Sequence, residues 1–346
     1  MNEEFTKVNT SLAFQEIARG ISEYVKKYNL KSMILGLSGG IDSTVCAALC
    51  WIAKQKLKSE GYDVQIIGVS LPCSSNGDDE NDIAARCSCF CDKFRVQNLE
   101  YDYYRFRESC EVGIEVLENK DDVSLTPIAQ GNIKARLRMI YLYNLASMYN
   151  GIVIDTDNLT EHFLGFWTIH GDDGDLNPIG SLWKTEVYDM AKSLIGYLIG
   201  YFAASSIEAK EFNKEDTKLD AYRKMSDYDC MVKCLEDACA ITPTDGNGVA
   251  VGGDLAQIAP GKTYADVDYI LQSVIPSYEA GLIPSENVLE CLYSKYGKET
   301  VERVISRYKG SKYKRAHRPL VITILGNVEG KDKSFDLSIR TKKNNG

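Results

Sequence analysis

Small, glycine-rich and hydroxyl-bearing residues interrupt an apolar stretch near the N-terminus of this chain. In MILGLSGGIDSTVCAALC (residues 33–50), a strand-like run gives way to a Ser-Gly-Gly turn and then to a helical pattern. A turn of this kind at the start of a helix presents unpaired backbone N–H groups and the positive end of the helix dipole to an anion. The segment therefore predicts a phosphate site. The residues that would hold the phosphate oxygens are Ser38, Gly39, Gly40 and Ser43.

Asp42 lies inside this pattern, where its carboxylate would repel phosphate unless a cation lay between them. Mg²⁺ is the expected cation, because it prefers oxygen ligands and is commonly shared between a carboxylate and substrate phosphates. The alternative is that Asp42 only caps a helix and that the glycines only form a tight turn. The full Ser-Gly-Gly-x-Asp-Ser pattern favours the phosphate site. It is neither a Walker loop, which requires a Lys, nor the G-x-G-x-x-G dinucleotide motif.

Three later segments carry polar residues that could complete such a site. In GNIKARLRMIYLYNLA (131–146), cations crowd the first turns of a predicted helix, where they oppose the dipole unless an anion is bound. A solvated basic face is the alternative for Lys134 and Arg138. Glu161 would be a second carboxylate for the metal ion, and Lys184 begins a helix from which it could reach a phosphate. The basic segment SKYKRAHRP, near the C-terminus, would by itself be a surface patch.

The elements expected to position these residues alternate between strands and helices. The expected strands are 32–37, 64–71, 95–101 and 151–156, and the expected helices are 11–28, 42–57, 78–94 and 131–149. Such alternation predicts an α/β fold, a doubly wound parallel sheet flanked by helices, with ligands at the carboxyl ends of its strands. The expected domain organisation is a single domain over 1–330 with a helical insertion at 195–240, followed by a flexible tail at 331–346.

The overall composition limits the classes of function. The 346 residues are 44% hydrophobic and 26% charged, and the formal net charge of -9 gives no support for a nucleic-acid-binding surface. The acidic N-terminus is unlike a signal peptide, and no apolar run reaches the length of a membrane span. Because the eleven cysteines are scattered, we expect reduced thiols and a cytoplasmic protein.

The cysteines at 87, 89 and 91 alternate with other residues in RCSCFCDKF. On a helix, neighbouring members of this series would lie about 200° apart, so they could not all face one metal ion. We therefore expect buried or half-exposed thiols here, and core thiols at Cys230, Cys234 and Cys239. The three histidines do not have a metal-ligand spacing either.

Taken together, the motifs resemble those of a known family. LSGGIDSTV is similar to the pyrophosphate-binding loop of the N-type ATP pyrophosphatases, whose fold is adenine nucleotide alpha hydrolase-like. The segments GNIKAR, TDNLTEHFLGFWTIHGD, LWK, PT in TPTDG and YKRAHRP, in this order, resemble ammonia-dependent NAD synthetase. The resemblance covers about residues 10–325, apart from 195–240.

The resemblance implies roles for individual residues. ATP and its pyrophosphate would be bound by Ser38, Gly39, Gly40, Asp42, Ser43, Thr156, Lys184 and Thr244, and Mg²⁺ by Asp42 and Glu161. Deamido-NAD would be bound by Asn132, Arg136, Asp172, Asp175, Lys314 and Arg315. The catalytic residues would be Asp172, which would attract ammonium and accept its proton, and Lys184 and Thr244, which would steady the α-phosphate.

The reaction implied is ATP-dependent amidation of deamido-NAD to NAD through an adenylated nicotinate, with ammonia as nitrogen donor and AMP and pyrophosphate as products. The resemblance also implies a homodimer, and a separate glutaminase could supply the ammonia. Two alternatives stay open: another adenylating N-type ATP pyrophosphatase, such as a tRNA-modifying enzyme, and a non-catalytic nucleotide-binding homologue. Ser70, Ile169 and Tyr313 stand where Arg, Lys and His are usual in the family.

Overall fold

A parallel sheet forms the centre of the computed structural model, which describes residues 8–74, 78–119, 123–171, 173–203, 227–243, 255–317, 320–322 and 328–329. The strand order is β3-β2-β1-β4-β5-β6-β7. The strands are β1 (Ser32–Gly36), β2 (Gln65–Ser70), β3 (Lys93–Val96), β4 (Gly151–Ile154), β5 (Leu176–Asn177), β6 (Leu320–Ile322) and β7 (Val328–Glu329). Pairing is parallel from β3 to β6, and β7 runs antiparallel to β6. The predicted doubly wound α/β fold is confirmed.

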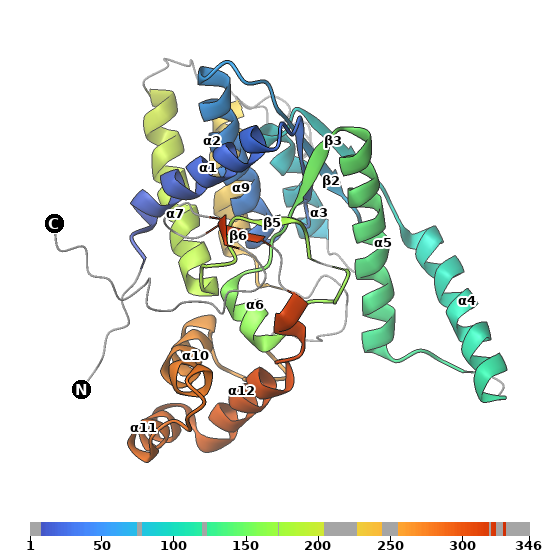
Figure 1. The fold of residues 1–346 in the computed structure, drawn as a ribbon, viewed down its shortest axis with the longest axis vertical. Coiled ribbons are helices and arrows are strands. Elements are labelled where there is room, and N and C mark those ends of the chain that lie inside the picture. The colour runs from blue at the N-terminus through green and yellow to red at the C-terminus, as the bar shows by residue number, and fades with distance from the viewer. Residues whose placement is uncertain are drawn as a thin grey trace, which may run out of the picture.

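Helices cover both faces of the sheet, because alternate side chains of each strand point to opposite faces. Met33 and Leu35 belong to one buried cluster, and Ile34 belongs to another on the opposite face. The first cluster joins the strands to α1 (Thr10–Lys27), α2 (Ile41–Ser59), α7 (Lys184–Ala203) and α9 (Asp227–Ala240). The opposite face is covered by α5 (Pro127–Met148), which contacts β1 and β4 (Figure 1).

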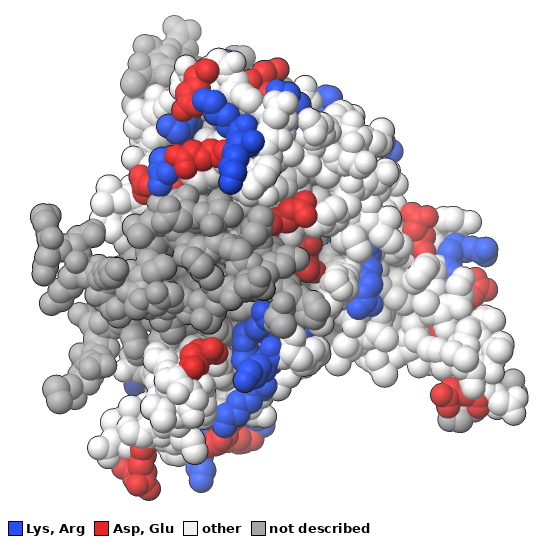
Figure 2. Space-filling model, in the orientation of Figure 1, with Lys and Arg blue, Asp and Glu red and all other residues white. Residues whose placement is uncertain are grey.

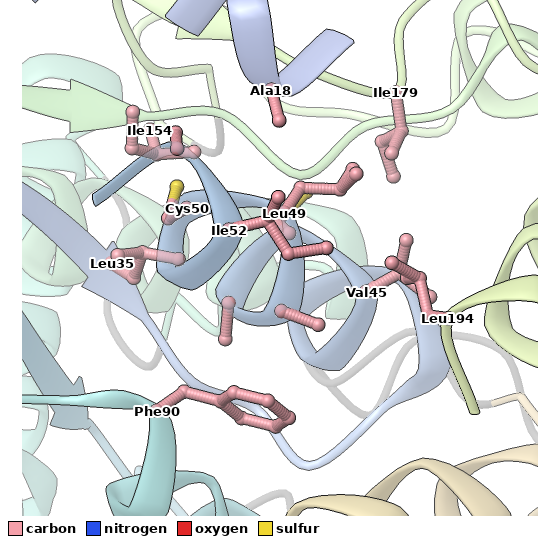
Figure 3. Packing of buried hydrophobic residues seen from close by; sticks show 14 of the residues in the cluster. Ala18, Leu35, Val45, Leu49, Cys50, Ile52, Phe90, Ile154, Ile179 and Leu194 are labelled. Atoms are coloured by element: carbon pink, nitrogen blue, oxygen red, sulfur yellow. The ribbon is translucent and has the colours of Figure 1, made fainter. Parts of the chain in front are cut away.

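Helix α2 lies in the middle of the larger cluster. Figure 3 shows its side chains Val45, Leu49 and Cys50 pointing in different directions, toward Leu194 of α7, toward α1, and toward the strands. A helix that is apolar on every side belongs in a core rather than on a surface. The helix that begins at the predicted phosphate site is therefore fixed by packing along its length.

A second buried cluster lies away from the sheet. It is built by α10 (Tyr264–Glu279), α11 (Glu286–Tyr296) and α12 (Lys298–Gly310), which pack on α6 (Leu159–Leu164). Figure 1 shows these three C-terminal helices as a group next to α6. Because α6 follows β4 and contributes to this cluster, the two halves of the described chain meet beside the carboxyl ends of the strands.

The structure corrects the expected elements around residue 95. The strand predicted at 95–101 is β3, which ends at Val96, and Glu100 already begins α4 (Glu100–Glu118). The helix predicted at 78–94 ends earlier, as α3 (Asp78–Arg86) and the 3₁₀ helix η1 (Cys87–Phe90). Sequence patterning missed α4 because Tyr103 is the only residue of this helix that is buried, so its apolar periodicity is weak.

The predicted insertion and tail are described only in part. Residues 195–203 continue α7, and α9 supplies one helix of the predicted insertion. Residues 204–226 and the expected tail at 331–346 lie outside the described residues.

Candidate active site

The glycine-rich segment forms the connection between β1 and α2. Gly39 has a φ of +87°, and a Cβ at this position would collide with the backbone oxygen of Glu80. Only glycine combines that backbone angle with such a close approach. Gly40 is the N-cap of α2, and no side chain caps this helix. This is the geometry of an anion site at a helix N-terminus.

Hydroxyl groups stabilise the turn from within. The Ser43 Oγ lies 3.1 Å from the Ser38 Oγ and donates to the carbonyl oxygen of Gly40 at 3.2 Å. The Thr44 Oγ1 donates to the same carbonyl at 2.9 Å. The backbone N–H of Gly40 donates to the Ser38 Oγ at 3.2 Å. These hydrogen bonds fix the shape of the turn. The same hydroxyl groups could donate to the oxygens of a phosphate instead.

Two carboxylates and one ammonium group meet beside this turn. The Nζ of Lys184, at the start of α7, donates to Asp42 of α2 and, at 3.2 Å, to the Oε1 of Glu161 in α6. The Lys184 side chain is 2% exposed, whereas each carboxylate is 15% exposed. Burial lowers the pKa of the Lys184 ammonium, but the two carboxylates raise it, and the net result is a pKa well above the usual lysine value. Lys184 is therefore a buried, charged group.

Asn158 is hydrogen-bonded to both Asp42 and Glu161 and so fixes their relative position. It is the N-cap of α6, and its side chain accepts the N–H of Glu161 at 3.0 Å while the Glu161 carboxylate accepts the N–H of Asn158 at 3.0 Å. The Asn158 Nδ2 also donates to the Oδ1 of Asp42 at 3.0 Å. This reciprocal capping arrangement fixes Glu161, and the third bond ties it to α2.

A buried carboxylate sets the conformation of the loop after β4. Asp155 is 1% exposed, and its Oδ1 accepts the N–H of Asp157 and the Nδ2 of Asn177, both at 2.7 Å. Its Oδ2 accepts the N–H of Gly174 at 2.8 Å. These partners lie in the loop after β4, just before β5 and at the end of β5, so Asp155 positions the loop that carries Thr156.

A second buried carboxylate links the C-terminal helices to Lys184. Asp268 of α10 accepts from the Thr160 hydroxyl at 2.5 Å, and from the N–H and hydroxyl of Thr185 at 3.1 and 2.8 Å. The Thr160 Oγ1 in turn accepts the N–H of Lys184 at 2.9 Å. Burial raises the pKa of Asp268 to about 6, although the bonds from the two threonines lower it.

The glycine turn, Asp42, Glu161 and Lys184 line a cavity of about 920 Å³ that extends from the β1–α2 turn to α12. Its acidic side chains are Asp42, Glu80, Asp157, Glu161 and Asp173, and its basic side chains are Arg138, Lys184, Arg303, Arg307 and Lys314. Figure 2 shows a run of Lys and Arg side chains over α12. The cavity thus has carboxylates near the glycine turn and cations on its α5 and α12 walls.

The structure brings most of the predicted ATP-site residues to this cavity. Those that line it are Ser38, Gly40, Asp42, Ser43, Thr156, Glu161 and Lys184, with Asn132 and Lys314 from the predicted deamido-NAD set. Gly39 lies in the same turn but is not part of the lining. Asp172 and Thr244, predicted to be catalytic, lie outside the described residues.

Three residues predicted to bind deamido-NAD do not line the cavity. Arg136 is exposed and donates to the carbonyl of Ile169 at 3.3 Å. The Asp175 carboxylate accepts from the Tyr143 hydroxyl at 2.9 Å and from the N–H of Val153 at 3.2 Å. Arg315 donates to the carbonyl of Tyr308 and to the Ser311 hydroxyl, at 2.8 and 3.0 Å. A role in binding the acceptor remains a prediction for all three.

The remaining predicted acceptor residues are also engaged within the fold. Asn132 accepts from the Thr168 hydroxyl at 2.8 Å. The Lys314 Nζ donates to the backbone carbonyls of Gly165, at 2.8 Å, and Trp167. Lys314 thus holds the loop after α6 in place, and it also lines the cavity.

Sequence patterning left two cations of α5 open and did not identify two arginines of the cavity wall. Arg138 is half-buried, and its Nε donates to the carbonyl of Leu71 at 3.0 Å, which contradicts the solvated face considered for it. Lys134 is buried as well, over the ring of Tyr103. Arg303 and Arg307, both on α12, were not proposed, although their spacing of four residues places them on one face of a helix.

The carboxylates of the cavity suit a magnesium ion. Asp42 and Glu161 supply hard carboxylate oxygens on one wall, which is the donor type that Mg²⁺ prefers when substrate phosphates complete its shell. Within the described ranges, no group of three or more His, Cys, Asp and Glu side chains is placed to hold a metal ion. The arrangement therefore suits an ion shared with a bound phosphate better than a resident metal.

None of the described helices is long and apolar enough to cross a membrane.

Comparison with known proteins agrees with this geometry. The family model described as NAD synthase matches residues 13–200. The NH(3)-dependent NAD(+) synthetase of Carboxydothermus hydrogenoformans is 34% identical over 189 residues, which are 54% of this chain and 72% of that protein. The enzyme of the same name from Burkholderia cenocepacia is also 34% identical over 189 residues, but only 64% of its length is matched, together with 52% of this chain.

A solved structure shares the fold at low sequence identity. The NMN synthetase from Francisella tularensis superimposes with a TM-score of 0.58 at 22% identity, over 89% of this chain and 96% of that one. Similarity at this level shows the fold alone, whereas the family model covers more than half of the chain, including the glycine turn, Asp42, Glu161 and Lys184. The chain belongs to the NAD synthase family.

Proposed function

We propose that this protein is an ATP-dependent ligase that amidates deamido-NAD to NAD, with ammonia as the nitrogen donor. The observation that carries the proposal is that Asp42 and Glu161 lie beside the glycine turn, in one cavity, in a chain of the NAD synthase family. A glycine turn at a helix N-terminus suits the β- and γ-phosphates of ATP. The two carboxylates suit a magnesium ion, which would neutralise charge on the phosphates when bound.

The proposed reaction has two steps. The nicotinate carboxylate attacks the α-phosphorus, the bond to the bridging oxygen breaks, and pyrophosphate leaves toward the glycine turn. Ammonia then attacks the acyl carbon, loses a proton, and displaces AMP. In both steps the protein acts by positioning and by compensating charge, as is usual in phosphoryl transfer.

We assign the residues on the nucleotide side as follows. Ser38, Gly39, Gly40 and Ser43 bind the leaving pyrophosphate, and Thr156 lies near the adenosine. Lys184 keeps Asp42 and Glu161 in position with two of its N–H groups. An ammonium group has three donors, and the third is assigned to an oxygen of the α-phosphate.

The residues on the acceptor side remain assignments that rest on the sequence motifs. Asn132, Arg136, Lys314 and Arg315 would bind the pyridine dinucleotide, with Asp172, Asp175 and Thr244 near the reacting groups. Arg138, Arg303 and Arg307 join this set because they give the cavity a cationic wall, which suits the phosphates of a dinucleotide.

A homodimer is part of the proposal. Helix α4 carries several large apolar side chains in contact with solvent, among them Tyr101, Val116 and Leu117 at 75%, 77% and 83% exposure. Exposed apolar residues in such number on one projecting helix suit a surface that a second copy covers. Light scattering of the full chain would test this, because Leu117→Lys should then yield monomers.

One assay tests the reaction and separates it from the two alternatives. The purified full chain is incubated with ATP, Mg²⁺, deamido-NAD and either ammonium or glutamine, and NAD and AMP are quantified by chromatography. We expect equal amounts of NAD and AMP with ammonium. AMP formed only when tRNA is added would indicate a tRNA-modifying enzyme, and ATP binding without any product would indicate a non-catalytic homologue.

A matched pair of variants links the reaction to the site. Asp42→Asn removes one carboxylate charge at the glycine turn and should lower kcat by a factor of about 10²–10³, the usual cost of removing one preorganised electrostatic group. Glu60→Gln changes a carboxylate at the other end of α2, where the side chain is at the surface, and should leave kcat unchanged. Equal activity of both variants would contradict the assignment of Asp42.

A further inference from the structure

Four thiols meet away from the cavity, where η1 contacts α9. The Cys87 Sγ lies 3.1 Å from the Cys234 Sγ, and both residues are fully buried. The Cys89 thiol is hydrogen-bonded to the Cys230 thiol. Cys230 and Cys234 are one turn apart on α9, so two neighbouring thiol pairs join this helix to η1. None of the proposed reaction steps uses them.

The arrangement favours disulfide chemistry over metal binding. A disulfide has an S–S distance of about 2.05 Å, so the Cys87 and Cys234 sulfurs need to approach by only about 1 Å. In the described part of the chain, these thiols do not form a group placed to hold a metal ion. The sulfurs are thus close in pairs rather than arranged around a common centre.

We propose that Cys87 and Cys234 are an oxidation site that forms a reversible disulfide between η1 and α9. The oxidant is hydrogen peroxide, which is small enough to reach buried thiols. One thiolate attacks a peroxide oxygen, the O–O bond breaks, and a sulfenic acid and water result. The second thiol attacks that sulfur, the S–S bond forms, and a second water molecule leaves. Two thiols are oxidised and one peroxide is reduced to two waters.

The site lies one contact away from the glycine turn. The Thr44 Oγ1, which donates to the carbonyl of Gly40 at 2.9 Å, lies 3.5 Å from the Cys87 Sγ. Residue 87 also directly follows α3, whose Glu80 backbone packs on Gly39. The disulfide would therefore tie α9 to the segment that supports the proposed phosphate site.

The thiols are expected to react slowly. Burial, together with the hydrogen bond to Cys87, raises the pKa of Cys234 well above its usual value, so that little thiolate is present at neutral pH. A slow reaction suits a site that responds to sustained oxidation rather than to brief exposure. Incubation for hours with excess peroxide is therefore the appropriate condition for a test.

The test is a disulfide map of the full chain. Protein treated with hydrogen peroxide, or with dithiothreitol, is denatured with an alkylating reagent, digested and analysed by mass spectrometry. We expect one cross-linked peptide that joins Cys87 to Cys234 and disappears after reduction. Cys46 and Cys50, buried on α2 and one turn apart, should be alkylated in both samples and serve as an internal control.

Thermal unfolding gives a second readout. The cross-link joins residues that are 147 positions apart, and long loops gain most from such closure in theory. We expect the oxidised protein to have a Tm higher by about 3–6 °C, which Cys234→Ser abolishes and Cys291→Ser, at an exposed thiol, retains.

Three results would overturn the proposal. One is full alkylation of Cys87 and Cys234 after a treatment that oxidises the exposed Cys291. Another is a cross-link confined to Cys89 and Cys230. The third is purified protein that holds about one equivalent of zinc and protects all four thiols from alkylation, which would make the cluster a metal site. Because the map uses the unmodified chain, a variant that fails to fold does not affect the decision.

Discussion

Replacing Lys184 by Met removes the buried ammonium group that Asp42 and Glu161 share, while it keeps most of the volume of the side chain. Lys184→Met leaves two carboxylates side by side in a cavity where each is 15% exposed. We expect the variant to fold with reduced stability and to lose activity. The loss has an electrostatic cause, because the packing around the methylene groups is retained.

The size of the effect follows from the geometry. At 3.2 Å, one ion pair contributes about 5 kcal/mol of Coulomb energy at an effective dielectric constant of about 20, and the desolvation of the ammonium offsets a large part of it. Breaking a buried pair by removing one partner costs about 3–5 kcal/mol. With an unfolding entropy of about 2.1 cal/mol/K per residue, this corresponds to a Tm lowered by about 4–7 °C.

Thermal unfolding of Lys184→Met is compared with that of Lys192→Met. Lys192 lies on the same helix, but its side chain is 70% exposed and its ion pair with Asp189 is at the surface. This control should change stability by less than about 0.5 kcal/mol. Mg²⁺ at a concentration about 100 times its Kd should restore about 2.7 kcal/mol to Lys184→Met, because the ion would replace the lost positive charge.

Two results would refute this reasoning. If Lys184→Met unfolded within 1 °C of Lys192→Met, the ammonium would not compensate the two carboxylates. If Mg²⁺ added together with ATP stabilised neither the wild type nor Lys184→Met, Asp42 and Glu161 would not form a magnesium site, and the proposed assignment of these residues would fail with it.

Three further predictions concern the supports of the cavity. Gly39→Ala should destabilise the fold and abolish ATP binding measured by calorimetry, because the φ of +87° and the contact with the backbone of α3 leave no room for a Cβ. Gly61 has a φ of +73° but lies in open space, so Gly61→Ala should cost only about 1 kcal/mol of stability. Asp268 binds its proton more tightly in the folded chain, with a pKa of about 6 against 3.8, so its contribution to stability should fall by about 2 kcal/mol as the pH rises from 4 to 6. Urea titrations should show this slope, and Asp268→Asn should remove it. Asn158→Ala should lower stability by about 1–2 kcal/mol through loss of the helix cap, and it should raise the KM for ATP. An unchanged KM would show that the hydrogen bond from Asn158 to Asp42 is dispensable.

Site residues could be predicted from the sequence where a single short segment carries them. The glycine turn, its hydroxyls and Asp42 lie within seven residues, and their placement after an apolar run sufficed to locate them at the end of β1. The alternation of strands and helices likewise predicted the parallel sheet. The errors arose where periodicity is weak, as in α4 and β3: α4 is mostly exposed, and β3 is four residues long with no buried position.

Long-range pairing was decided by the tertiary structure. Asp42 meets Lys184 and Asn158 across 142 and 116 positions, and no local pattern fixes which polar group of a distant loop faces another. From the sequence we expected Lys184 to reach a phosphate. In the fold its ammonium group lies between two carboxylates, because a buried cation needs compensating charge. In the same way, the cysteines that looked unrelated along the chain become neighbours only because α9 packs on η1.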